Sequence, residues 1–143
     1  MVKDIKVFKN QYYFLSNFYP CIVEYEGRTY PSSECAYQAA KSLDPEVRKF
    51  FETVSNSMSA RRWGNKIQLR PDWDTAKYDI MYQILKSKFK IPKLRKLLID
   101  TGDAYLEEGN MHGDKYWGTV KGQGQNNLGK LLMKIRDEIK AGE

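Results

Sequence analysis

Short apolar stretches near the start of the chain have the spacing of β-strands. Residues 5–8 alternate between apolar and polar side chains, and residues 21–25 and 28–30 bracket Glu26 and Gly27. Two residues of this kind between apolar stretches are typical of the tight turn that joins two antiparallel strands. The pattern therefore predicts a short β-hairpin near the N-terminus.

Most of the remaining chain has apolar residues at helical spacing, with residues that favour helix starts and stops at the ends of each segment. The expected helices begin at Ser32 or Ser33, at Asp44–Pro45 (to about residue 54), at Ser57 (to Gly64), at Asp72 (to Pro92), near Leu94 (to Gly102) and at Asn127. A glycine-rich loop over residues 107–125 precedes the last helix. A chain of 143 residues fits one domain. We therefore expect a single α+β domain over residues 1–143, mainly α with a short N-terminal hairpin.

The stretch PSSECAYQAAK, residues 31–41, carries the most informative polar pattern. At helical spacing, Glu34, Gln38 and Lys41 share one edge, while the opposite side holds cysteine and alanine. A solvated helix face explains this edge without any chemistry. The small residues and the nearby Tyr30 and Tyr37 favour a packed, partly screened helix instead. There a lysine loses its proton more easily and attacks a sugar aldehyde, while a carboxylate moves protons.

Charge and composition narrow the function classes. Lysine and arginine outnumber aspartate and glutamate by 24 to 18, and the net charge of +6 suits either an ordinary surface or phosphorylated partners. The high aromatic share of 13% favours a pocket lined with rings. Two cysteines form no disulfide framework, and the single His112 has no second histidine for a metal or catalytic pair. With no stretch apolar enough for a membrane span or a secretory signal, we expect a cytoplasmic protein.

Phosphate-binding groups are also present, although each has an ordinary structural explanation. Arg61 and Arg62 offer guanidinium forks for phosphate, or they are surface cations. Gly122, Gly124 and Asn126 stand before the last helix, where backbone N–H groups bind anions, or they form a loop and an N-cap. No nucleophile elbow, Walker loop or dinucleotide fingerprint is present, which removes the usual support for hydrolase, nucleotidase and dehydrogenase classes based on those motifs.

Five blocks in a fixed order resemble the NADAR family, also called YbiA-like. They are FLSNFYP (14–20), YPSSE with YQAAK (30–41), RWG (62–64), YWG (116–118) and GQNNLGKLLMKIR (124–136). The resemblance spans nearly the whole chain. It implies an N-glycosidase that cleaves the bond between a phosphorylated ribose and an amine. The implied substrates are ADP-ribose attached to guanine in nucleic acid, or phosphoribosylated pyrimidine intermediates of riboflavin synthesis.

The resemblance also implies roles for individual residues. Glu34 is expected to donate and accept protons, and Lys41 to form a Schiff base with C1 of the opened ribose. The implied substrate-binding residues are Trp117 and Gly118 beside the sugar, and Tyr37 or Phe18 on the base. Gln38 is a further substrate-binding candidate. Candidates for ribose hydroxyls, phosphate or positioning are Asn17, Arg62, Asp114 and Asn126. No metal, organic cofactor or obligate protein partner is implied.

Two other functions remain open at this point. A non-catalytic module would bind ADP-ribose or a related nucleotide with the same basic and aromatic groups. A general nucleic-acid binder would show an affinity that falls steeply with salt and ignores any ADP-ribosyl mark.

Overall fold

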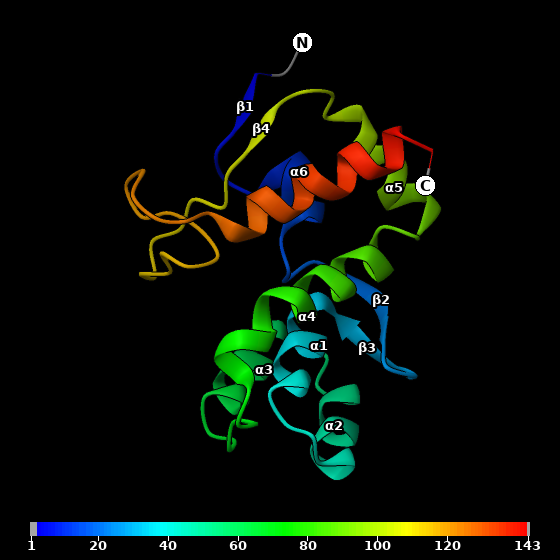
Figure 1. Ribbon diagram of the computed structural model, residues 1–143, viewed down its shortest axis with the longest axis vertical. Helices are drawn as coiled ribbons and strands as arrows, with labels where there is room; N and C mark the ends of the chain where they lie inside the picture. Colours follow the sequence, from blue (N-terminus) through cyan, green and yellow to red (C-terminus); the bar gives the residue numbers. More distant parts are fainter. Residues whose placement is uncertain (1–2, 143) are drawn as a thin grey trace. The chain divides into compact units, whose positions relative to one another are not determined.

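The computed structural model describes residues 3–142 and has the expected α+β composition (Figure 1). Its elements are β1 (Asp4–Ile5), η1 (Asn10–Leu15), β2 (Pro20–Tyr25), β3 (Arg28–Ser32), α1 (Ser33–Ala40), α2 (Pro45–Glu52), α3 (Ser57–Gly64), α4 (Trp73–Lys88), α5 (Pro92–Asp100), β4 (Tyr105–Leu106) and α6 (Asn127–Lys140). The chain forms two compact units. Unit 1 combines the residues up to 16 with those from 89 onward, and unit 2 comprises residues 17–88.

The predicted hairpin is present in unit 2. Strands β2 and β3 pair antiparallel, with Tyr25 opposite Arg28 and Val23 opposite Tyr30. Glu26 and Gly27 have φ angles of 48° and 81°, the left-handed conformation that a two-residue hairpin turn requires. The predicted hairpin and its two-residue turn are therefore confirmed.

Helix α1 is the centre of unit 2. It follows β3 directly, and the side chain of Ser32 accepts a hydrogen bond from the Cys35 N–H as the N-cap. The helix packs against α2, α3, α4 and both strands of the hairpin. Its alanine and cysteine side chains are fully buried, and close approach of neighbouring elements on several sides leaves all eight residues buried.

The other helices of unit 2 begin close to the predicted residues. Asp44 caps α2 and Pro45 fills its first turn, as expected. Helix α3 begins at Ser57 and ends at Gly64, as expected, and the side chain of Asn56 is its N-cap. Helix α4 is the longest element and packs against β2 as well as α1.

Unit 1 contains pairings that the local pattern did not predict. Ile5 pairs in parallel with Leu106 in the two-stranded sheet of β1 and β4. Residues 10–15 form the 3₁₀ helix η1. Helices α5 and α6 pack together, and the buried Arg136 donates a hydrogen bond of 2.9 Å to Thr101 Oγ1. The expectation that residues 5–8 belong with the hairpin was wrong. Local alternation of apolar and polar residues does not identify a parallel partner strand that lies about a hundred residues away.

Candidate active site

Glu34 is a buried acid in the first turn of α1. It is 5% exposed, and its Oε2 accepts a hydrogen bond of 2.6 Å from Gln38 Nε2, one turn further along the helix. The same oxygen lies 3.7 Å from Nε of Arg61 on α3. The interpretation of this helix edge as a solvated face is therefore wrong. A carboxylate held in this way is positioned by its neighbours rather than by water.

Gln38 is held as tightly as the acid it contacts. It is 3% exposed, and a Cβ built on Gly64 would lie 1.8 Å from Gln38 Oε1. Only glycine at the end of α3 lets the two helices approach this closely. Gln38 Oε1 itself is buried without a hydrogen-bond partner within residues 3–142. A buried acceptor of this kind is a candidate contact for a ligand donor.

Lys41 stands at the C-terminal end of α1 and is partly buried. Its Nζ lies 5.9 Å from the ring centroid of Tyr37, which packs against Trp73 with ring centroids 5.1 Å apart. Burial lowers the pKa of Lys41 below its usual 10.5; the negative charge of Glu34 partly offsets this effect, and Arg61 adds to it. More of this amine is neutral near physiological pH than in an ordinary lysine, which favours nucleophilic attack.

Arg61 connects the acid to an aromatic ring. Its guanidinium carbon lies 4.5 Å from the centroid of Phe18, in addition to the ion pair with Glu34. Arg62 is exposed, so the structure places Arg61, and not Arg62, beside the acid. A sequence signal for this existed: Ser57, Ala60 and Gly64 form a buried stripe of small residues, and Arg61 falls within that stripe.

Asn17 lies on the other side of Glu34. Its backbone carbonyl accepts a hydrogen bond of 3.0 Å from the Glu34 N–H, and its side-chain Nδ2 lies 3.6 Å from Met81 Sδ. Asn17 Oδ1 is buried and has no hydrogen-bond partner within the described residues. Unit 2 therefore brings together six of the predicted residues: Asn17, Phe18, Glu34, Tyr37, Gln38 and Lys41.

Apart from Arg62, which is exposed on α3 of unit 2, the remaining candidates belong to unit 1. Asp114 Oδ1 accepts hydrogen bonds from the backbone N–H groups of Tyr116 and Trp117, at 3.0 and 2.8 Å. A Cβ on Gly118 would lie 2.0 Å from the Glu108 carbonyl oxygen, so this position requires glycine. Asp114 therefore fixes the backbone that presents the Trp117 side chain, which favours positioning among the roles considered for it.

The side chain of Asn126 joins α6 to the segment around β4 within unit 1 by hydrogen bonds. Its Oδ1 accepts a bond of 2.9 Å from the Glu108 N–H, and its Nδ2 donates to the Leu106 carbonyl at 2.9 Å. The N–H groups of Asn127 and Leu128 donate to the carbonyls of Tyr116 and Trp117. These backbone groups at the start of α6 are already occupied, which weakens the hypothesis of an anion site there.

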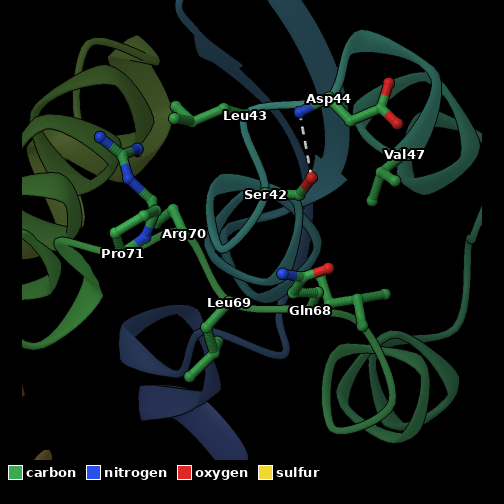
Figure 2. Close-up of a pocket in the computed structure, with 9 residues that line it drawn as sticks. Ser42, Leu43, Asp44, Val47, Gln68, Leu69, Arg70 and Pro71 are labelled. Atoms are coloured by element: carbon green, nitrogen blue, oxygen red, sulfur yellow. Dashed lines mark hydrogen bonds between the residues drawn. The ribbon is translucent and has the colours of Figure 1, made fainter.

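A shallow hollow of about 330 Å³ lies next to the chain segment that follows Lys41 (Figure 2). Its lining comprises Ser42, Leu43, Asp44, Val47 and residues 67–71. Neither Glu34 nor Lys41 lines it, so this hollow is not the centre of the candidate site. Within residues 3–142, no group of three or more His, Cys, Asp or Glu side chains is placed to hold a metal ion, and no helix is long and apolar enough to cross a membrane.

Together these observations define an α+β protein whose central helix carries a buried acid two turns before a partly buried amine. The chain belongs to the NADAR domain family, whose profile matches residues 5–140. The membership predicted from the five sequence blocks is thus confirmed. The NMR structure of the E. coli protein YbiA superposes with a TM-score of 0.85 at 36% identity and covers 99% of this chain and 88% of that one.

Curated relatives carry two kinds of name. N-glycosidase YbiA of Escherichia coli strain K12 is 38% identical over 128 residues, which cover 87% of this chain and 79% of that protein. An N-glycosidase of Nostoc punctiforme is 34% identical over 132 residues, covering 87% of this chain and 84% of the relative. A riboflavin biosynthesis protein of Vibrio vulnificus is 36% identical over 130 residues, covering 88% of this chain but 35% of that longer protein.

Proposed function

We propose that this protein is an N-glycosidase that hydrolyses the bond between a phosphorylated ribose and the amine of a nitrogen base. The observation that carries the proposal is the edge of α1. There Glu34 is buried and bonded to Gln38, and burial lowers the pKa of Lys41 on the same helix. A buried acid and an amine with a lowered pKa are the two groups that a Schiff-base hydrolysis needs.

The proposed reaction proceeds by exchange of one amine for another. Lys41 first passes its proton to the carboxylate of Glu34, and the neutral amine then adds to C1 of the opened ribose. Glu34 gives this proton to the leaving nitrogen of the base. The bond from C1 to the base breaks, which leaves a Schiff base between C1 and Lys41. Water then adds to C1 and gives a proton to Glu34, the bond from C1 to lysine breaks, and the sugar leaves with a free aldehyde. The sum is hydrolysis, with both side chains restored.

The comparisons support the class of reaction. Relatives that match most of this chain are named N-glycosidases, and others are named riboflavin biosynthesis proteins. Both names fit a substrate with ribose attached to a nitrogen base. We favour ADP-ribose on guanine as the substrate, with phosphoribosylated aminopyrimidines as the second substrate class.

Other residues are assigned to binding in this proposal. Phe18 and Tyr37 offer rings for the base, and the free acceptors Asn17 Oδ1 and Gln38 Oε1 offer oxygens for ribose hydroxyls. Trp117 and Gly118 of unit 1 remain predicted contacts of the sugar. Asp114 acts through the backbone of Trp117, and Arg62 and Asn126 remain predicted contacts of phosphate and ribose.

Product analysis tests the reaction directly. The protein is incubated with DNA carrying ADP-ribosylated guanine and, separately, with a phosphoribosylated aminopyrimidine, and products are separated by chromatography. We expect release of ADP-ribose or ribose phosphate together with the unmodified base. Intact substrate in both reactions would refute the proposal.

Borohydride reduction tests the intermediate. Reduction during turnover should fix the sugar to Lys41, and peptide mass spectrometry should find the adduct there. Lys41→Arg keeps the positive charge but forms no Schiff base, so it should give no adduct and no turnover. The exposed Lys93, changed to arginine in the same way, is the matched control and should trap normally. An adduct on another lysine, or turnover by Lys41→Arg, would remove Lys41 from the mechanism.

A non-catalytic ADP-ribose module is the alternative, and Glu34→Gln separates it from the enzyme. The change keeps the size of the side chain and removes its proton chemistry. An enzyme with this acid should lose turnover while calorimetry still detects ADP-ribose binding. A wild-type protein that binds ADP-ribose tightly, cleaves no substrate and binds equally well after Glu34→Gln would be a binding module.

A further inference from the structure

Unit 2 carries an exposed aromatic pair that the proposed reaction does not use. Phe50 on α2 is 42% exposed and Trp63 on α3 is 47% exposed, and their ring centroids lie 5.3 Å apart in an edge-to-face arrangement. Nζ of Lys66 lies 5.3 Å from the Trp63 ring centroid. Large rings are usually placed in the core, so two exposed rings in contact indicate a surface that meets a partner.

The charge around these rings is mainly positive. From Thr53 to Pro71 the sequence contains Arg61, Arg62, Lys66 and Arg70 and no carboxylate. Arg61 pairs with Glu34 and Arg70 with Asp72. The structure shows no ion pair for Arg62 or Lys66 within residues 3–142, which leaves both charges available.

Helix α2 adds one more cation on its exposed side. Lys49 precedes Phe50 and has no ion pair within the described part of the chain. The exposed Glu46, one turn earlier, is the nearest acid along this face, since Glu52 is bound to Arg28. We call Lys49, Phe50, Arg62, Trp63 and Lys66 the aromatic patch. Its rings are surrounded mainly by unpaired positive charge.

We propose that the aromatic patch binds single-stranded nucleic acid. Bases stack on exposed rings irrespective of sequence, and cations beside the rings follow the phosphates. An exposed Trp and Phe with three unpaired cations provide both parts. Protein interfaces also use Trp, Phe and Arg, so a protein partner is the occupant indicated if the wild type does not bind a nucleic-acid probe.

The patch shares helix α3 with the candidate active site. Trp63 follows Arg61 by two residues, so its side chain points to roughly the opposite side of the helix, about 200° around the axis. Arg61 contacts Glu34 across α1, and the patch therefore lies about one helix diameter, roughly 10 Å, from the acid. A strand stacked on Trp63 is within a few nucleotides of Glu34. The inference thus deepens the proposed function, on which it rests for the base that is presented to the acid.

The hollow of Figure 2 continues the patch along α2. Val47, which lines it, is one turn from Phe50, and Ile67, which also lines it, follows Lys66. Its volume of about 330 Å³ is at the small end of ligand pockets. We assign this hollow to the next base of the bound strand.

Binding of unmodified nucleic acid tests the inference without relying on catalysis. The probe is a short fluorescein-labelled single-stranded DNA of mixed sequence, followed by fluorescence anisotropy over a range of salt concentrations. Trp63→Ala should weaken binding by at least about fivefold, the loss expected for one stacked base, and Trp63→Phe should retain most of the affinity. Arg62→Ala should lower the slope of log affinity against log salt by about 0.7, the value for one phosphate contact.

Tyr78→Ala is the matched control, because Tyr78 is an aromatic residue of unit 2 with a similar exposure of 40%. This variant should bind like the wild type. Equal binding by wild type and Trp63→Ala, or no binding of the probe by the wild type, would overturn the inference. Circular dichroism of each variant checks folding, which substitution of the exposed Trp63 should leave unchanged.

Turnover separates this inference from the proposed function. Trp63→Ala should lower kcat/KM for an ADP-ribosylated oligonucleotide at least fivefold more than for ADP-ribosylated guanosine. If the wild type cleaves neither substrate but binds DNA through Trp63, the proposed function fails and the patch remains. If it cleaves both and Trp63→Ala affects them equally, the patch fails and the function remains.

Discussion

Gly64→Ala perturbs the candidate site through a single methyl group. The new Cβ would lie 1.8, 2.5 and 3.1 Å from Oε1, Cδ and Cβ of Gln38, its three nearest atoms. Gln38 is buried at 3% exposure and cannot swing into solvent. Relief of the overlap therefore moves its amide away from Glu34, and the hydrogen bond of 2.6 Å is lost.

The expected cost follows from three effects. Overpacking costs about 1–3 kcal/mol, and the lost hydrogen bond to a charged group costs about 1.5–3 kcal/mol. Replacing glycine by alanine in a helix returns up to about 1 kcal/mol. We expect Gly64→Ala to lower the free energy of unfolding by roughly 1.5–6 kcal/mol, so a domain near the middle of the ordinary range of about 5–15 kcal/mol stays mostly folded.

The same change should be almost free of cost when Gln38 is already alanine. The two nearest atoms are then absent, and the remaining Cβ at 3.1 Å needs a shift of only a few tenths of an ångström. A double-mutant cycle measured by urea denaturation should give a coupling free energy of about 2 kcal/mol or more between residues 38 and 64.

Activity distinguishes position from stability in this cycle. The double variant Gln38→Ala/Gly64→Ala should recover stability relative to Gly64→Ala but not turnover, because Glu34 still lacks its partner. Equal destabilisation by Gly64→Ala in both backgrounds would refute the reasoning. Recovery of turnover in the double variant would show that Gln38 does not position the acid.

Three further changes test other parts of the structure. Arg61→Gln removes a charge that lowers the pKa of Lys41, so the rise of kcat/KM with pH should move to higher pH in a pH-rate profile. Lys88 is fully buried, and burial lowers its pKa from 10.5 to about 8. The free energy of unfolding should therefore rise by about 3 kcal/mol between pH 8 and pH 10.5. Lys88→Met should flatten this pH dependence in urea titrations. Asp114→Ala removes the acceptor of two backbone N–H groups, so it should lower the free energy of unfolding by about 1–3 kcal/mol and reduce turnover. Asp114→Asn keeps an acceptor oxygen and should retain most of the stability and most of the turnover. Denaturation and kinetic assays measure the two quantities.

The outcomes that contradict these predictions are specific. A pH-rate profile of Arg61→Gln that moves to lower pH would contradict the charge argument. For Lys88 the sign is fixed because burial favours the neutral amine, so below pH 8 the ammonium destabilises the fold. Stability that falls between pH 8 and 10.5, or a Lys88→Met variant with the slope of wild type, would contradict the assignment. Equal losses for Asp114→Ala and Asp114→Asn would show that the acceptor oxygen is not what matters.

Local chemistry made much of unit 2 predictable from the sequence. The turn at Glu26 and Gly27 and the caps at Ser32 and Asp44 depend on residues next to each other, and each lies where it was expected. The pairing of β1 with β4 depends on residues about a hundred positions apart and on strands of two residues each. Strands that short have no detectable period, so only the folded chain reveals them.

The candidate site shows the same limit in its electrostatics. The spacing of Glu34, Gln38 and Lys41 placed them on one edge of a helix, but that spacing is equally typical of a surface helix facing water. What makes the edge reactive is supplied by other segments: α3 brings Arg61 to the acid, and the surrounding helices bury it.

The choice between Arg61 and Arg62 was nevertheless present in the sequence. Ser57, Ala60 and Gly64 are the small residues of α3, and at helical spacing they define the side that a neighbouring helix can approach closely. Arg61 lies on that side and Arg62 lies beside it, toward solvent. The position of the small residues thus places Arg61 beside the buried acid and leaves Arg62 and Trp63 on the exposed surface. Adjacent residues of one helix therefore serve the proposed chemistry and the proposed binding of nucleic acid.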